Sequence, residues 1–157
     1  MTSLFVDCDD TLALFCWKPE EPRCPHGNIH PYGSKHSPWD ANTRLLEGIR
    51  AFRAANPEAD IVIWSGGGRE YAQTFIDTLL PDIKAISWDK IKPWIQAMVQ
   101  EGDIVVDDQP IVSKGTHFYP HEWPPRLYDD VDEETTEKAL RQATRRALKA
   151  DDYETAP

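Results

Sequence analysis

The sequence has no long hydrophobic run and no excess of basic residues. No apolar segment approaches the roughly 20 residues that a membrane-spanning helix needs. The first ten residues, MTSLFVDCDD, have no basic stretch ahead of an apolar one, so we expect no signal peptide. Lys and Arg number 17 against 27 Asp and Glu, a formal net charge of −10. Such a chain is a poor candidate for coating nucleic acid or for binding a membrane surface, because both need a basic field.

Cysteine is scarce, and the three residues present form no disulfide framework. Cys8, Cys16 and Cys24 are odd in number, which is typical of reduced thiols. We therefore expect a cytoplasmic protein. The chain has 157 residues, of which 40% are hydrophobic and 28% charged, and this predicts a folded domain with a sizeable core rather than a disordered chain.

Strand-like and helix-like segments alternate along the first 110 residues. Short apolar runs predict strands at residues 4–6, 61–64, 83–88 and 104–106, with one more short strand at 117–119. Helices are expected after an N-cap at Asp40 or Asn42, from about Arg69 to Leu80, and from Pro93. This alternation predicts an α/β fold: a Rossmann-like parallel sheet with helices on both faces.

The chain divides into one domain and a tail. Residues 1–128 are predicted to form the domain, which includes an irregular segment at 15–38 that contains most of the early Pro, His and Cys residues. Residues 129–157 are predicted to form an acidic C-terminal helix and a frayed end. We see no internal repeat.

Polar residues stand directly after three of the predicted strands. Asp7 and Asp9 follow the first, Ser65 follows the second, and Asp107 and Asp108 follow the fourth. Because the carboxyl ends of parallel strands share one edge of a sheet, we expect these groups to meet there. Clustered carboxylates favour a hard cation such as Mg²⁺, and two carboxylates in different environments can act as nucleophile and as general acid and base.

Several segments resemble the motifs of one enzyme family. Residues 4–12, LFVDCDDTL, are similar to motif I of the haloacid dehalogenase (HAD) superfamily, an apolar strand followed by DxDxT. Residues 61–66 resemble motif II, residues 104–108 resemble the DD form of motif IV, and a lysine before the strand at 104–106 fits motif III. The motifs follow the family's order over residues 1–110. The resemblance implies a HAD-like fold without a large cap domain, because segment 15–38 is too short for one.

The resemblance also implies a role for each matched residue. Asp7 would be the nucleophile that forms a phosphoaspartate, and Asp9 would be the general acid and base. Ser65 and the N–H of Gly66 would bind the phosphoryl oxygens. Mg²⁺ would be held by the Asp7 carboxylate, the Asp9 backbone carbonyl, Asp107 and Asp108. These roles fit the chemistry of phosphoryl transfer, in which a negative group needs a metal ion, a cation and aligned donors.

The motifs define the phosphate-site lysine and the substrate contacts less sharply. We favour Lys92 as the phosphate-site lysine, because Lys92-Pro93 at a helix start resembles the family's usual context, and Lys90 is the alternative. Thr11 and Arg69 are candidate substrate contacts; for Arg69 the simpler interpretation is a solvated residue in the first turn of a helix.

The resemblance implies a Mg²⁺-dependent phosphatase. The second acid of DxD indicates a phosphate ester, because the leaving oxygen of an ester needs a proton. The expected substrate is a phosphorylated small molecule, a nucleotide or a nucleic-acid end. The alternatives are a phosphatase of small sugar phosphates and a HAD-fold binding or scaffold protein without turnover.

The irregular segment 15–38 contains a second set of metal-ligand residue types. Cys16, Cys24, His26 and His30, with His36 as a substitute, could hold a structural Zn²⁺. Their spacing matches no standard zinc module, so the preferred interpretation is incidental Cys and His residues, or a His near the phosphate site.

Overall fold

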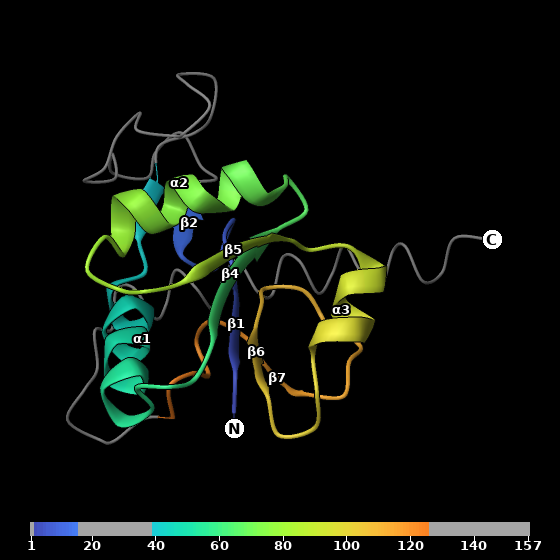
Figure 1. Ribbon diagram of the computed structural model, residues 1–157. Helices are drawn as coiled ribbons and strands as arrows, with labels where there is room; N and C mark the ends of the chain where they lie inside the picture. The colour runs from blue at the N-terminus through green and yellow to red at the C-terminus, as the bar shows by residue number, and fades with distance from the viewer. Residues whose placement is uncertain (1, 16–38, 126–157) are drawn as a thin grey trace.

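Five parallel strands form the centre of the molecule. The computed structural model describes residues 2–15 and 39–125. The strands are β1 (Leu4–Asp7), β4 (Ile61–Ser65), β5 (Ile86–Asp89), β6 (Ile104–Val106) and β7 (Thr116–Phe118). Their order across the sheet is β5-β4-β1-β6-β7, and every neighbouring pair is parallel (Figure 1). The predicted α/β fold with a parallel sheet is confirmed.

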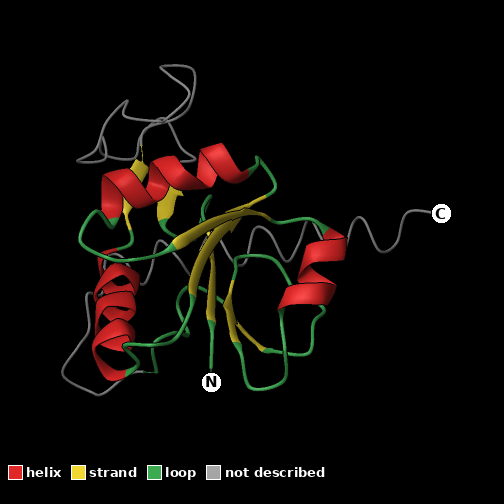
Figure 2. Ribbon diagram, viewed as in Figure 1, coloured by secondary structure: helices red, strands yellow, loops and turns green. Residues whose placement is uncertain are grey.

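Three helices cover the two faces of this sheet. Helices α1 (Thr43–Ala55) and α2 (Arg69–Leu79) pack with Leu4 and Val6 of β1 in the larger apolar cluster. Helix α3 (Lys92–Met98) belongs to the other face, where Phe5 lies in a smaller cluster. Figure 2 shows α1 and α3 on opposite sides of the sheet. Successive strand residues point to opposite faces, so one apolar run supplies both clusters.

A short antiparallel ribbon follows the end of β1. It consists of β2 (Ala13–Phe15) and β3 (Trp39–Ala41), and residues 16–38 between them lie outside the described part. Trp39 is 2% exposed and packs in the larger cluster. The sequence predicted irregular chain up to residue 38 and a cap at Asp40 or Asn42. The cap is Asn42, whose side chain accepts a hydrogen bond from the Leu45 N–H at 3.2 Å, and Asp40 lies in the ribbon.

Strand β5 and helix α3 differ slightly from what the sequence predicted. Strand β5 begins at Ile86, three residues later than predicted. Helix α3 has no buried residue, and Trp94 on it is 39% exposed. Helix α2 and strand β7 are confirmed. The expected C-terminal helix and tail of residues 129–157 lie outside the described residues.

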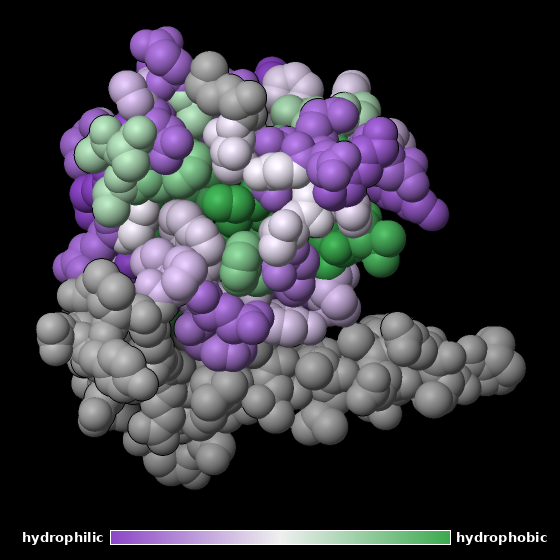
Figure 3. Space-filling view, turned by 90° about the horizontal axis from the view of Figure 1, so that it is seen from below, coloured by the Kyte–Doolittle hydropathy of each residue, from purple (hydrophilic) through white to green (hydrophobic). Residues whose placement is uncertain are grey.

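Figure 3 views the molecule from the amino ends of the strands, where hydrophilic residues surround small hydrophobic areas. Within residues 2–15 and 39–125, no helix combines the length and apolar character that crossing a membrane requires.

Candidate active site

The register of the sheet brings three strand ends together. Val6 pairs with Ile63 on one side and with Val106 on the other, so Asp7 at the end of β1 lies between the ends of β4 and β6. Asp107 follows β6 directly. The sequence predicted this meeting of polar groups, and the structure confirms it for these two carboxylates.

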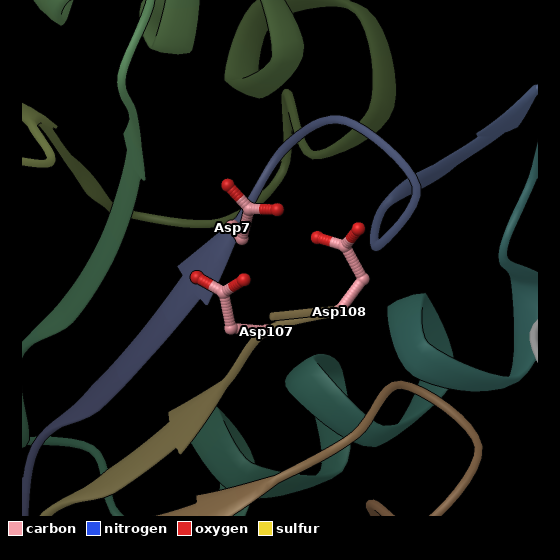
Figure 4. Close-up of side chains that lie close together, drawn as sticks. All are labelled: Asp7, Asp107 and Asp108. Carbon is pink, nitrogen blue, oxygen red and sulfur yellow. The ribbon is translucent and has the colours of Figure 1, made fainter. Parts of the chain in front are cut away.

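Three carboxylates converge at this edge. The side chains of Asp7, Asp107 and Asp108 each offer an oxygen, and these oxygens lie within 4.8 Å of one another. Figure 4 shows the three carboxyl groups turned toward a common space between β1 and the chain that follows β6. All three residues are buried, with at most 4% of their surface exposed. Such a buried acidic cluster needs a cation to be stable when it is ionised.

Lys90 supplies one positive charge to the cluster. Its Nζ lies 2.7 Å from Asp7 Oδ1 and 2.9 Å from Asp107 Oδ2, so it bridges β1 and β6. Burial alone disfavours the ammonium, but the charges of Asp7 and Asp107 outweigh it and raise the pKa of Lys90. Lys90 therefore remains protonated in this site.

The motif context favoured Lys92 as the phosphate-site lysine, but the structure places the alternative, Lys90, at the carboxylate cluster. Strand β5 ends at Asp89, and the Lys90 N–H donates to the Ser65 carbonyl at 2.9 Å, which holds Lys90 at the edge where the strand ends meet. Lys92 is the first residue of α3 and is exposed. The lysine that contacts the carboxylates therefore stands directly after β5 and not at the start of α3.

One lysine cannot neutralise three carboxylates. Burial, followed by the charge of Asp7, raises the pKa of Asp107 and of Asp108 well above the usual range of an aspartate. These shifts mean that ionising the whole cluster is unfavourable without a further cation. Carboxylate oxygens are the ligands that Mg²⁺ prefers. The donor set of Asp7, Asp107 and Asp108 thus fits a divalent cation of this type.

Thr11 connects the side chain of Asp7 to the backbone of Asp108. Its hydroxyl donates to Asp7 Oδ2 at 3.0 Å and accepts from the Asp108 N–H at 3.2 Å. The residue is fully buried. The expectation that Thr11 contacts substrate stays a prediction. Its hydroxyl is already engaged on both sides, and its role is to orient Asp7 and the chain at Asp108.

The turn after β1 places Asp9 beside helix α2. The Cys8 carbonyl accepts hydrogen bonds from Leu12 and Ala13, at 3.0 and 3.2 Å, and closes the turn. Asp9 then lies within reach of Tyr71, whose hydroxyl donates to Asp9 Oδ1. Burial, partly offset by this hydrogen bond, raises the pKa of Asp9 to about 6. A carboxyl group with this pKa can act as acid and as base near neutral pH.

The helical period of the sequence placed Tyr71 only on the apolar face of α2. Its ring does pack there, 5.1 Å from the ring of Phe75, but its hydroxyl faces the site. The available signal was the residue type, because a buried tyrosine generally requires a hydrogen-bond partner that a phenylalanine would not.

The loop after β4 carries Ser65 and three glycines. The Ser65 hydroxyl accepts from the Gly67 N–H at 3.0 Å, and the Ser65 carbonyl accepts from the Gly68 N–H at 3.1 Å. Gly66 is exposed, and a Cβ added to it would meet no atom within 4 Å. Among the described residues, nothing covers the Cβ position of Gly66.

Arg69 begins α2 and is held by β5. Its Nε donates to the Ser87 carbonyl at 3.3 Å, and its guanidinium lies 4.0 Å from the centre of the Trp88 ring. The Arg69 N–H donates to Asp89 Oδ1 at 2.7 Å. The residue is exposed, and these contacts give it a role in packing the start of α2 against β5.

The other metal set of the sequence analysis cannot be placed. Cys16, Cys24, His26 and His30 all lie outside the described residues.

Comparisons of the chain with protein-family models, with curated proteins and with solved structures find no match in any of the three.

Proposed function

We propose that this protein is a Mg²⁺-dependent phosphatase of the HAD type, with Asp7 as the nucleophile. The observation that carries the proposal is the Lys90 bridge, 2.7 Å from Asp7 and 2.9 Å from Asp107, at the end of adjacent parallel strands. The motif order noted in the sequence supports it, because Asp7 of motif I, Lys90 before motif IV and Asp107 of motif IV lie together in the cluster.

Several features suit Asp7 to nucleophilic attack. One carboxylate oxygen contacts the Lys90 ammonium and the other accepts from Thr11, so the side chain is held in one orientation. A fixed orientation lowers the entropic cost of reaching the reacting phosphorus. Asp7, Asp107 and Asp108 would hold Mg²⁺, which when bound would neutralise charge on the phosphoryl group.

The first half of the reaction transfers the phosphoryl group to Asp7. An Asp7 oxygen forms a bond to phosphorus while the bond from phosphorus to the ester oxygen breaks. The electron pair of that bond goes to the leaving oxygen, and the proton on Asp9 goes to the same oxygen. Lys90, the Ser65 hydroxyl and the Gly66 N–H would face the negative charge of the transferring group.

The second half returns the enzyme to its starting state. Asp9, now a carboxylate, takes a proton from water, and the water oxygen bonds to phosphorus. The bond between phosphorus and Asp7 breaks, which releases inorganic phosphate and restores both side chains. The pKa of Asp9, about 6, suits both directions of proton transfer.

The proposed substrate class is phosphate monoesters, either phosphorylated small molecules or nucleotide and nucleic-acid ends. A panel of such esters, together with 4-nitrophenyl phosphate, is assayed for phosphate release with Mg²⁺ and with EDTA. We expect Mg²⁺-dependent release that Asp7→Asn lowers by about a thousandfold or more. The ranking within the panel identifies the substrate.

The matched control is Asp82→Asn, the same change at an exposed acid that pairs with Arg50 at 2.9 Å. This variant should keep the wild-type rate. An Asp7→Asn protein with near-normal rates would exclude Asp7 as nucleophile. A folded wild-type protein that releases no phosphate from any ester would favour the binding or scaffold alternative.

A further inference from the structure

We infer that Tyr71 is a positioning residue that directs the carboxyl group of Asp9 at the leaving oxygen of the substrate. The inference rests on the function proposed above and adds a residue that none of the motifs contains. Tyr71 is the third residue of α2 and is 7% exposed. Its hydroxyl donates to Asp9 Oδ1. In the proposed reaction, the other carboxyl oxygen of Asp9 would exchange the proton with the substrate.

The two partners lie in different parts of the fold. Asp9 pairs with Ala13 in an isolated bridge of the turn after β1 and is half-buried. Tyr71 lies on helix α2, with its ring in the larger apolar cluster and against Phe75. The hydrogen bond therefore ties the side chain of the acid to the helix. A catalytic carboxyl group needs such support, because a small misplacement costs a large part of the rate.

The same ring also contacts the loop that follows β4. A Cβ added at Gly67 would lie 3.2 Å from Cγ and from Cδ1 of the Tyr71 ring, so the glycine allows the loop to pack closely on it. The Gly67 N–H in turn donates to Ser65 Oγ. Tyr71 thus contacts both the proposed phosphoryl-binding loop, through its ring, and the proposed acid, through its hydroxyl.

The position of the Asp9 proton affects cleavage of the bond between phosphorus and the leaving oxygen. As Asp7 bonds to phosphorus, the leaving oxygen departs with the electron pair and takes the proton of Asp9. Tyr71 keeps its own proton throughout and acts only through Asp9. An alkoxide is strongly basic and needs the proton, whereas a nitrophenolate is stable without it. The contribution of Tyr71 must therefore grow with the basicity of the leaving group.

The test is Tyr71→Phe, which keeps the ring and removes the hydroxyl. The value of kcat/KM is measured with Mg²⁺ for glycerol 2-phosphate, for phenyl phosphate and for 4-nitrophenyl phosphate. This parameter reports the steps up to formation of the phosphoaspartate. We expect kcat/KM to fall about tenfold or more for the glycerol ester but by less than about threefold for the nitrophenyl ester.

Two comparisons isolate the role of the hydroxyl. Tyr119→Phe removes the hydroxyl of a half-buried tyrosine that packs against His117 and His121, and it should not change the ratio between the esters. In an Asp9→Asn background, Tyr71→Phe should have no further effect, because the residue it positions is gone. The ratio of kcat/KM between two esters does not depend on the fraction of protein that is folded.

Equal losses on all three esters, or full additivity with Asp9→Asn, would overturn the positioning role and leave the phosphatase intact. Absence of Mg²⁺-dependent phosphate release by the wild-type protein would overturn the proposed function, and this inference with it.

Discussion

At the scale of single residues, the balance of charge around Asp7 decides what the site can bind. Three buried carboxylates share one lysine, and burial followed by the charge of Asp7 raises the pKa of Asp107 and of Asp108, so the full negative charge of the cluster does not develop without a further cation. A divalent cation would allow all three acids to ionise, because its charge and that of Lys90 together balance theirs. Under the proposed function, a negative phosphate ester would therefore bind together with such a cation.

The position of the lysine can be tested directly. We expect Lys90→Met to lower kcat/KM by about a hundredfold or more, because the ammonium that orients Asp7 and faces the phosphoryl group is lost. Lys92→Met, the same change two residues later at an exposed position, should remain within about twofold of wild type. Steady-state assays on both variants, with circular dichroism to compare their folds, provide the measurement. A large loss in Lys92→Met with normal rates in Lys90→Met would contradict the assignment.

At the scale of elements, Asn42 connects helix α1 to the turn that carries the site. Its side-chain oxygen caps the helix at the Leu45 N–H, and its Nδ2 donates to the Thr11 carbonyl at 3.0 Å. The backbone adds a bond from the Asn42 N–H to the Leu12 carbonyl at 2.8 Å. The start of α1 thereby supports the residue whose hydroxyl orients Asp7.

We expect Asn42→Ala to lower the free energy of unfolding by about 1–2 kcal/mol, because it removes an N-cap and leaves a buried carbonyl with one partner fewer. Urea denaturation followed by circular dichroism measures the loss. Glu47→Ala, at an exposed position of the same helix, serves as the control and should change the stability by less than about 0.5 kcal/mol. Equal stabilities of wild type and Asn42→Ala would show that the cap contributes nothing.

At the scale of the whole molecule, the site connects elements that are distant in the sequence. Lys90 from the end of β5 contacts Asp7 from β1 and Asp107 after β6, and Thr11 contacts both Asp7 and the Asp108 backbone. A cation held by Asp7, Asp107 and Asp108 would strengthen these connections. Binding at the site should therefore stabilise the entire fold.

Mg²⁺ should raise the unfolding temperature, with a gain of about 2.7 kcal/mol when its concentration is a hundred times the dissociation constant. The pKa of Asp108 is raised in the folded protein, so at neutral pH this acid destabilises the fold when no cation is bound. We therefore expect Asp108→Asn to melt at a higher temperature than wild type in EDTA but to gain less from Mg²⁺. Thermal melts with and without Mg²⁺ measure both effects.

Asp103→Asn is the control for this pair of effects. Asp103 is a buried acid just before β6 and accepts hydrogen bonds from the Ser3 and Gln100 N–H groups, at 2.9 and 2.8 Å. Its replacement should lower stability while the gain from Mg²⁺ stays at the wild-type level. If Mg²⁺ stabilises wild type and Asp108→Asn equally, Asp108 does not take part in binding the cation.

Much of the fold was predictable from the sequence because it depends on local patterns. Apolar runs bounded by acids or glycines predict strands such as β1, β4 and β6, and a period of 3.6 predicts the buried face of α2. A polar residue after each strand predicts a shared site, because parallel strands end at one edge. From these patterns the sequence by itself determined the α/β class, the sheet edge that carries the site and the pairing of Asp7 with Asp107.

Other features depend on distances that no local pattern contains. Lys90 and Lys92 are almost equivalent in the sequence, and only the register of β5 against β4 decides which ammonium reaches Asp7. The burial of Thr11 and the contact between Tyr71 and Asp9, 62 residues apart, likewise follow from packing of the turn against α2 and β6. The tertiary structure decided these points, because hydrogen bonds between distant residues depend on how whole elements pack.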